Sequence, residues 1–443
     1  MSETLQTVRI HILSGLSKGM ADAIRSGQME SAKVWTVCRD ELHRCMSQRE
    51  KWPNRDDLQK LTKGRFALHS QSVQMVCHAF LANVDTAKQL RKSGRTEIRY
   101  PWRDKTFYPL LWPKQAVSIQ GNKVILPMGR GRASIVFAKP DWLEGPAPCK
   151  LIWNRNHYEA HFTVEIQVVS KVENGLHATV DLGQIHQCAV TTNDGHGLVV
   201  SGRGIRSEKR RLNKMHSQIA KLQSRCKKGS RRWKKLQRSR NDYALRSERR
   251  IRDLRHKGTR QVIEFCRAHG VSSLFIGNPE GVRQRRCGRK HNQRMSQWEY
   301  GKDIDYLTHK SKQAGISSFT GSERGTSSRC PVCGHRHKPK DRNWVCPECG
   351  FKGHRDLVGS VNMHLLAFGE KTTFPAANAV TYLRPGTSAR KCLDRSSRPD
   401  TGHAKPGMLL HENTGSTASE ASLPWVARAT GQTRVHSSEA HSL

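Results

Sequence analysis

Two Cys-x2-Cys pairs constrain the fold of this chain more than any other feature. The first pair is Cys330 and Cys333, the second is Cys346 and Cys349, and only a short spacer separates them. A glycine follows each pair, where the backbone has to bend back. Tetrahedral Zn²⁺ takes two thiolates from each such turn, so the spacing predicts a zinc ribbon over residues 326–350. Two disulfides or a redox pair are the alternatives, but the remaining cysteines are scattered, as is typical of a reduced cytosolic chain.

An acidic residue follows the second pair. Asp356 opens an apolar run with helical spacing, which predicts that it lies in the first turn of a helix beside the ribbon. A carboxylate fixed by a helix and a metal-bound loop is a candidate functional residue.

The net charge indicates the kind of partner. The 443 residues carry a formal net charge of +40, with a pI near 10.3, which favours a polyphosphate partner. The length leaves room for two or three domains. The sequence has no apolar run long enough to span a membrane and no signal-peptide pattern. We therefore expect a cytoplasmic, nucleoid-associated bacterial protein that binds no membrane.

The N-terminal part combines strand and helix patterns. Residues 1–13 and 96–170 alternate with the period of strands, with a hairpin turn at Gly121-Asn122. Residues 14–95 have helical periodicity. This order predicts a small β-barrel with a helical insertion after its first strand. The helices could be core only, or their basic residues could form a nucleic-acid face.

The pattern after residue 170 is that of a mixed α/β domain. A buried strand (178–182) carries Asp181 near its end, and a later strand ends at Glu323. The order of strands and helices over 171–325 and 351–368 is that of an RNase H-like sheet. In that fold, carboxylates from separate segments meet at the end of the central first strand and hold two Mg²⁺ ions for phosphodiester hydrolysis. A buried acid otherwise costs free energy, unless the strand end is solvated.

A strongly basic helical pair interrupts this domain. Residues 205–258 have helical apolar spacing, and the Lys228-Gly229-Ser230 break predicts two antiparallel helices. Such a charge excess repels itself without a polyanion, so we expect contacts to the nucleic-acid backbone. The candidate contact residues are Arg210, Arg211, Lys214, Lys221, Lys227, Lys228, Arg231, Arg232, Lys234 and Lys235.

Three motifs in order carry a family resemblance. VDLGQIHQCAVTTNDG, the basic helices with their KKGS break, and ERGTSSRCPVCG…CPECGFKGHRDLVGSVNM resemble the TnpB family, the transposon-encoded "transposase OrfB" proteins related to small type V CRISPR effectors. The N-terminal part is similar to that family's wedge barrel with its helical recognition insertion. The resemblance covers roughly residues 1–368.

The resemblance implies an RNA-guided DNA endonuclease of a transposable element with a RuvC-type site. A guide RNA would pair with the target double-stranded DNA while the protein, as a monomer or dimer, reads a short adjacent motif. Asp181 matches the first catalytic acid and Asp356 the last, both as magnesium ligands. Cys330, Cys333, Cys346 and Cys349 match the zinc ligands.

The chain departs from the family pattern at one catalytic position. The family ends its fourth strand in a pattern like I-E-D-L, whereas this chain has Gly277 at the acid position. Glu280, in the following loop, or Glu323, at the end of the next strand, could supply the carboxylate. We favour Glu323 because a strand end positions a side chain more firmly than a loop does. If neither reaches, the site is inactive.

A second departure surrounds the last acid. The chain has His354-Arg355-Asp356-Leu357-Val358 where the family commonly has D-R-D-x-N. His354 could bind near the metals or a phosphate, whereas Val358 loses an amide.

The C-terminal residues 369–443 are rich in Ser, Thr, Gly, Pro and Ala, which predicts a disordered tail. Three alternatives to a transposon nuclease remain. They are a nuclease-impaired guided binder acting as a repressor or targeting module, a small type V CRISPR effector, and a transposase that joins strands itself. No tyrosine or His-x-His nuclease motif supports the last.

Overall fold

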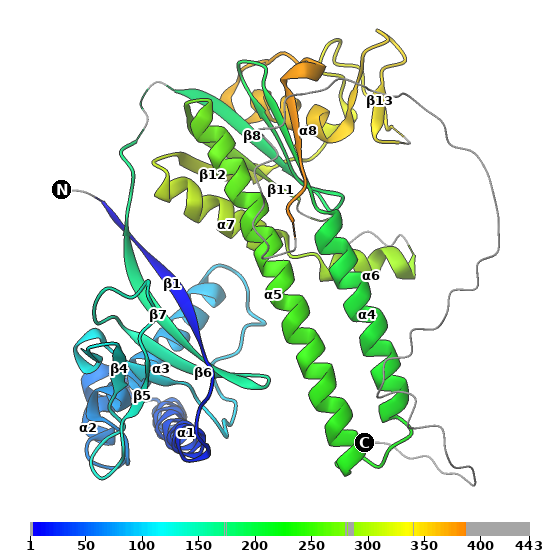
Figure 1. Ribbon diagram of the computed structural model, residues 1–443. Coiled ribbons are helices and arrows are strands. Elements are labelled where there is room, and N and C mark those ends of the chain that lie inside the picture. Colours follow the sequence, from blue (N-terminus) through cyan, green and yellow to red (C-terminus); the bar gives the residue numbers. More distant parts are fainter. Residues whose placement is uncertain are drawn as a thin grey trace, which may run out of the picture. The chain divides into compact units, whose positions relative to one another are not determined.

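The computed structural model describes residues 3–171, 173, 175–279, 281, 288–339 and 341–386 (Figure 1). Among these residues, no helix is long and apolar enough to cross a membrane.

Two antiparallel sheets form the N-terminal part. The first has the order β1-β7-β6-β2 and the second the order β3-β4-β5. Gly121, with φ of +54°, makes the predicted hairpin turn in the second sheet. The strands expected of a barrel therefore fall into two sheets, and their closure into a barrel stays a prediction. The strands are β1 (Thr4–Leu13), β2 (Leu110–Trp112), β3 (Ser118–Gln120), β4 (Lys123–Leu126), β5 (Ile135–Ala138), β6 (Cys149–Asn154) and β7 (His157–Gln167).

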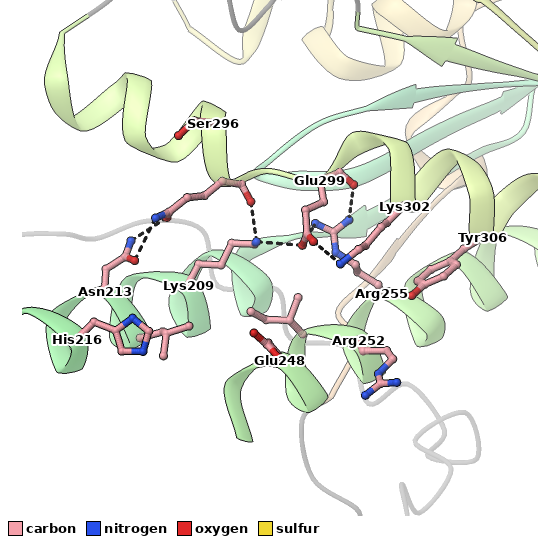
Figure 2. A pocket seen from close by; sticks show the side chains of 13 residues that line it. Lys209, Asn213, His216, Glu248, Arg252, Arg255, Ser296, Glu299, Lys302 and Tyr306 are labelled. Carbon is pink, nitrogen blue, oxygen red and sulfur yellow. Dashed lines mark hydrogen bonds and ion pairs between the residues drawn. The ribbon is translucent and has the colours of Figure 1, made fainter. Parts of the chain in front are cut away.

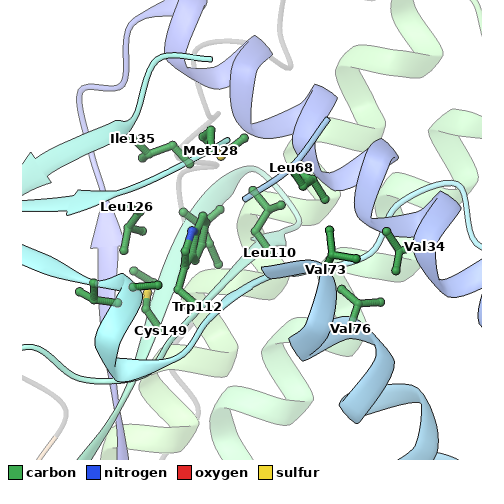
Figure 3. Packing of buried hydrophobic residues seen from close by; sticks show 14 of the residues in the cluster. Val34, Leu68, Val73, Val76, Leu110, Trp112, Leu126, Met128, Ile135 and Cys149 are labelled. Atoms are coloured by element: carbon green, nitrogen blue, oxygen red, sulfur yellow. The ribbon is translucent and has the colours of Figure 1, made fainter. Parts of the chain in front are cut away.

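The helical insertion after β1 shares a core with these sheets. It consists of α1 (Lys18–Ser47), α2 (Arg55–Thr62) and α3 (Ser70–Lys92). Val34 of α1 and Val76 of α3 belong to the same buried cluster as Trp112 of β2 (Figure 3). The apolar faces of these helices are thus occupied by core packing, which leaves their polar faces for solvent or a ligand.

A six-stranded sheet forms the second part, with the order β12-β11-β8-β9-β10-β15. β8 lies inside the sheet, antiparallel to β9 and parallel to β11, and β11 is parallel to β12. The C-terminal ends of β8, β11 and β12 therefore meet at one edge of the sheet. The strands are β8 (Leu176–Leu182), β9 (His186–Thr192), β10 (Gly197–Ser201), β11 (Val271–Asn278), β12 (Ser317–Ser322) and β15 (Val380–Leu383).

Five helices accompany this sheet. The predicted basic pair is α4 (Arg203–Gln223) and α5 (Arg231–Ala268), which lie side by side (Figure 1). α6 (Arg289–Gln297) and α7 (Tyr300–Gln313) follow β11. α8 (Arg355–Phe368) is fixed to the sheet by buried hydrogen bonds, since Thr179 donates to the carbonyl of Ser360 (2.7 Å) and Ser360 donates to the carbonyl of Thr179 (2.9 Å). Short 3-10 turns occupy Lys114–Ala116, Thr326–Ser328 and Ala377–Ala379.

The prediction of a disordered tail over residues 369–443 is wrong for the first part of that segment. Residues 380–383 form β15, which pairs in parallel with β10, and Phe374 packs edge-on against Phe351 at 5.0 Å. The open edge of β10 offers unpaired backbone groups, so a short segment can pair there without the apolar surface that an independent fold needs. Residues 387–443 lie outside the described residues.

Candidate metal and nucleic-acid sites

The four ribbon cysteines come together as the spacing predicts. The Sγ atoms of Cys330 and Cys349 are 3.6 Å apart, and those of Cys333 and Cys346 are 3.5 Å apart. Ligands of tetrahedral zinc at Zn–S of about 2.3 Å are separated by roughly 3.8 Å, whereas a disulfide needs about 2.0 Å. The four thiols are thus free and fit Zn²⁺, and neither disulfide alternative is formed.

The ribbon packs against the helix that carries Asp356. Trp344, in the hairpin of β13 (Asn343–Val345) and β14 (Lys352–His354), forms a buried cluster with Cys330, Cys346 and Val358. Val358, which replaces the family's amide, therefore joins α8 to the ribbon. Asn362, one turn further on, donates to the carbonyls of Thr326 (2.8 Å) and Arg329 (2.7 Å).

Three of the predicted acidic residues lie close enough for their charges to shift one another's pKa values. Asp181 is near the end of β8, Glu323 follows β12, and Asp356 lies in the first turn of α8. Burial, then the charges of Glu323 and Asp356, raise the pKa of Asp181 well above its usual range. Burial and the charge of Asp356 raise the pKa of Glu323 to about 7. The structure thus brings together carboxylates from three separate segments.

Two glycines make room for these carboxylates. A Cβ atom on Gly277 would lie 2.5 Å from Oε2 of Glu323, and one on Gly359 would lie 2.6 Å from Oδ2 of Asp181. Glu323 therefore occupies the space beside the position where the family has its acid. Glu280, the other candidate, lies outside the described residues.

Arg342 and His186 bind Asp356, and neither residue was predicted from the sequence. Arg342 donates to Oδ2 of Asp356 (2.5 Å), and Nδ1 of His186 lies 2.8 Å from the same oxygen. Burial opposes ionisation, but the hydrogen bond from His186 and the charge of Arg342 outweigh it and lower the pKa of Asp356. Arg342 reaches this place because its carbonyl accepts from the amide of Arg355 (2.7 Å) across the ribbon hairpin. Nothing in the local sequence indicates that contact, whereas His186 could have been suspected from its place at the start of the strand antiparallel to β8.

The donor set at this edge fits divalent cations. Oε2 of Glu323 is buried without a hydrogen-bond partner among the described residues. An unpartnered buried carboxylate beside the like charge of Asp356 is the arrangement that a bound cation relieves. The ligand atoms of His186, His354 and Asp356 also lie within 4.8 Å of one another, so nitrogen donors adjoin the carboxylates.

Ion pairs join the walls of the cavity in Figure 2. It measures about 650 Å³ and lies among α4, α5, the end of α6 and the start of α7. Lys209 of α4 lies 3.1 Å from a carboxylate oxygen of Glu299. The buried Arg255 of α5 donates to Asp303 and to the carbonyl of Glu299. These contacts fix α7 against the helical pair.

A larger hollow of about 930 Å³ on α4 is strongly basic. No Asp or Glu is among the described residues that line it. Burial, then the charges of Arg294, Arg342 and Arg203, lower the pKa of Arg206 in its wall. We call this hollow the basic groove. Its cationic residues are Arg203, Arg206, Lys209, Arg210, Lys214, Lys290 and Arg294.

The predicted nucleic-acid residues fall into three sets. Arg210 and Lys214 line the basic groove, whereas Arg211 pairs with Glu208 (2.9 Å). The remaining seven predicted residues lie at the end of α4, in the following turn and at the start of α5. Periodicity predicted the helices but could not show that α6 adds Lys290 and Arg294 to the same groove.

Comparisons with known proteins identify relatives of this chain. The family model "OrfB_IS605: Probable transposase" matches residues 161–283, and "Cas12f1-like, TNB domain" matches residues 300–363. The TnpB-like protein ORF457 of Acidianus two-tailed virus is 24% identical over 306 residues, 64% of this chain and 66% of that protein. MJ0856.1 of Methanocaldococcus jannaschii is 30% identical over 96 residues, 18% of this chain and 88% of that protein.

A solved structure shares the fold. The Cas12f1–sgRNA–target DNA complex contains a chain that superposes with a TM-score of 0.57 at 13% identity, over 78% of this chain and 83% of that one. This chain spans slightly less than two thirds of the viral relative. The motifs in the sequence, the family models and the relatives agree, and the chain belongs to the TnpB family.

Proposed function

We propose that this protein is an RNA-guided DNA endonuclease of a transposable element, with a RuvC-type site at the edge of the six-stranded sheet. The observation that carries the proposal is the convergence of Asp181, Glu323 and Asp356, each placed by a different element. Membership of the TnpB family and the fold shared with Cas12f1 support it.

The three carboxylates would hold two Mg²⁺ ions. When bound, such ions activate a water molecule and stabilise the leaving oxygen of a phosphodiester. Arg342 and His186 hold Asp356 ionised and fix the direction of its carboxylate. Gly359 lets the backbone of α8 approach Asp181, so that the first and last acids lie together. The four cysteines would hold the Zn²⁺ that keeps Arg342 in place.

The basic groove would bind the phosphates of a nucleic acid beside this site. Lysine and arginine contacts to phosphates give affinity without sequence information. Sequence would be read by a guide RNA paired with one target strand, and the protein would read a short adjacent motif. A small type V CRISPR effector would use the same division of labour.

Cleavage of a plasmid library tests the proposal. The library carries one fixed target beside randomised flanks, and the protein is expressed with RNA from its own locus. We expect wild type to cut beside one flanking motif in Mg²⁺, and Asp181→Ala, Glu323→Ala and Asp356→Ala each to abolish cutting. Glu280→Ala should cut like wild type, because Glu323 rather than Glu280 completes the site.

A guided binder without nuclease activity is the second candidate, because Gly277 replaces the family's acid. RNA-dependent retention of one flanking motif without cutting would support this binder and overturn the nuclease. Cutting lost in Glu280→Ala but kept in Glu323→Ala would overturn our assignment of the third carboxylate.

A further inference from the structure

A second group of metal-ligating side chains lies away from the acidic site. It consists of Asp194 and His196, in the turn between β9 and β10, and His269, at the C-terminal end of α5. The β8–β9 register pairs Asp181 with Ala189 at one end and Ala178 with Thr192 at the other. The turn therefore lies at the end of the sheet opposite to the proposed nuclease site.

The geometry of this group suits one shared ion. One ligand atom from each of the three residues lies within 4.8 Å of the others, and the two imidazole rings are 4.3 Å apart at 38°. Nδ1 of His196 is buried and lies 3.1 Å from Oδ2 of Asp194, so these two ligands already face each other. Ligands about 2.0 Å from a tetrahedral ion are roughly 3.3 Å apart, so small side-chain rotations would close the site.

The surroundings fix two of the three ligands. The buried Thr192 donates its hydroxyl hydrogen to Oδ1 of Asp194, which leaves Oδ2 directed at His196. The same hydroxyl oxygen accepts from the amide of His196 (3.1 Å), so one threonine closes the turn and orients its carboxylate. An outer residue that holds a ligand in this way is a regular part of protein metal sites.

The third ligand comes from a helix end that favours a cation. His269 caps the 38-residue α5, where unpaired carbonyl groups give the helix end a partial negative charge. Its ring packs at 4.5 Å from that of Phe265. Two imidazoles and one carboxylate suit Zn²⁺ and neighbouring divalent transition metals, whereas Mg²⁺ prefers oxygen donors alone.

We propose that Asp194, His196 and His269 bind a divalent transition-metal ion, with Zn²⁺ as the probe, that joins the β9–β10 turn to the end of α5. Three protein ligands leave a fourth position open to water or to a ligand. The proposal does not depend on the proposed nuclease activity.

Histidine-specific labelling of the full chain tests this site. The protein is treated with diethyl pyrocarbonate in excess Mg²⁺, with and without added Zn²⁺, and the modified histidines are mapped by mass spectrometry. We expect Zn²⁺ to protect His196 and His269 together at the same concentration. The exposed His43 of α1 should react equally in both conditions and serves as the internal control.

Two variants make the result specific. Asp194→Asn removes a ligand. Thr192→Val keeps all three ligands but removes the hydroxyl that orients Asp194 and accepts from the amide of His196. For Thr192→Val we expect half-protection at about a 10- to 100-fold higher Zn²⁺ concentration. Asp253→Asn, which removes an exposed carboxylate from α5, is the matched control and should leave protection unchanged. Equal labelling with and without Zn²⁺, protection of one histidine alone, or protection unaffected by Asp194→Asn would overturn the proposal.

Discussion

The carboxylate of Glu323 fills the space beside Gly277, where an added Cβ atom would lie only 2.5 Å from its Oε2. Gly277 pairs with Gly321 across the parallel strands β11 and β12, and Glu323 follows two residues later. A side chain at 277 and the present position of Glu323 exclude each other. We therefore propose that Glu323 supplies the carboxylate for which Gly277 leaves room.

This exclusion predicts that the carboxylate can be moved between strands. Gly277→Glu alone should abolish cutting, because two side chains compete for one space. The double variant Gly277→Glu/Glu323→Ala should recover cutting to well above either single variant, measured by plasmid cleavage in Mg²⁺. Gly145→Ala, at a position with nothing within 4 Å, is the matched control and should cut like wild type. A double variant as inactive as Glu323→Ala would contradict this account.

The raised pKa of Glu323 predicts a pH-dependent stability. Its carboxyl has a pKa of about 7 when folded, raised by burial and then by Asp356, against about 4.3 when unfolded. Between about pH 4.3 and about pH 7 the Glu323 carboxyl is protonated in the folded state but ionised in the unfolded chain. The free energy of unfolding therefore falls as the pH rises through this range, and it stays at the lower value above about pH 7. Without Mg²⁺, Glu323→Gln should be more stable at pH 8 by about 3 kcal/mol, and equal to wild type at pH 4.

Urea unfolding without Mg²⁺, with zinc retained, measures this difference. The control is Glu348→Gln, which removes an exposed carboxylate from the ribbon and should change stability equally little at both pH values. A Glu323→Gln variant less stable than wild type at pH 8 would show that the carboxylate is paired rather than unpartnered.

Zinc removal should release Trp344. This side chain is completely buried beside Cys330 and Cys346, and a structural zinc site supplies much of the folding free energy of its loop. Chelation should shift tryptophan fluorescence to longer wavelength and abolish cutting, because Arg342 and Asp356 lose their support. Trp344→Phe should lack the shift, and Cys226→Ser, which removes a thiol outside the ribbon, should behave like wild type. Full cutting by protein shown to be zinc-free would refute the structural role.

The basic groove should determine the salt dependence of nucleic-acid binding. Each phosphate contact contributes about 0.9 to the slope of log K against log salt. The triple variant Arg206→Ala/Arg210→Ala/Lys214→Ala should lower that slope by about 3 and weaken binding equally across sequences. Filter binding at several salt concentrations measures it. A control variant with the same change in net charge replaces Lys33, Lys88 and Arg260 by alanine; each of these residues pairs with an acidic residue of its own helix. An equal decrease of the slope in this control would contradict binding in the basic groove.

Local patterns were sufficient for much of the fold and part of the site. The cysteine spacing predicted the ribbon, because two turns with fixed sulfur positions admit few arrangements. Strand and helix periods predicted the hairpin at Gly121, the pair α4 and α5, and the position of Asp181 near a strand end. These features depend on residues close in sequence, which is why the sequence alone determines them.

Only the tertiary structure decided which residues from distant segments come into contact. The register of β11 against β12 brings Glu323 beside Gly277, and the ribbon hairpin brings Arg342 to Asp356. The pairing of β15 with β10 and the approach of His269 to His196 also join residues far apart in the chain. Such contacts depend on strand pairing and helix packing over long separations, and no local period in the sequence encodes them.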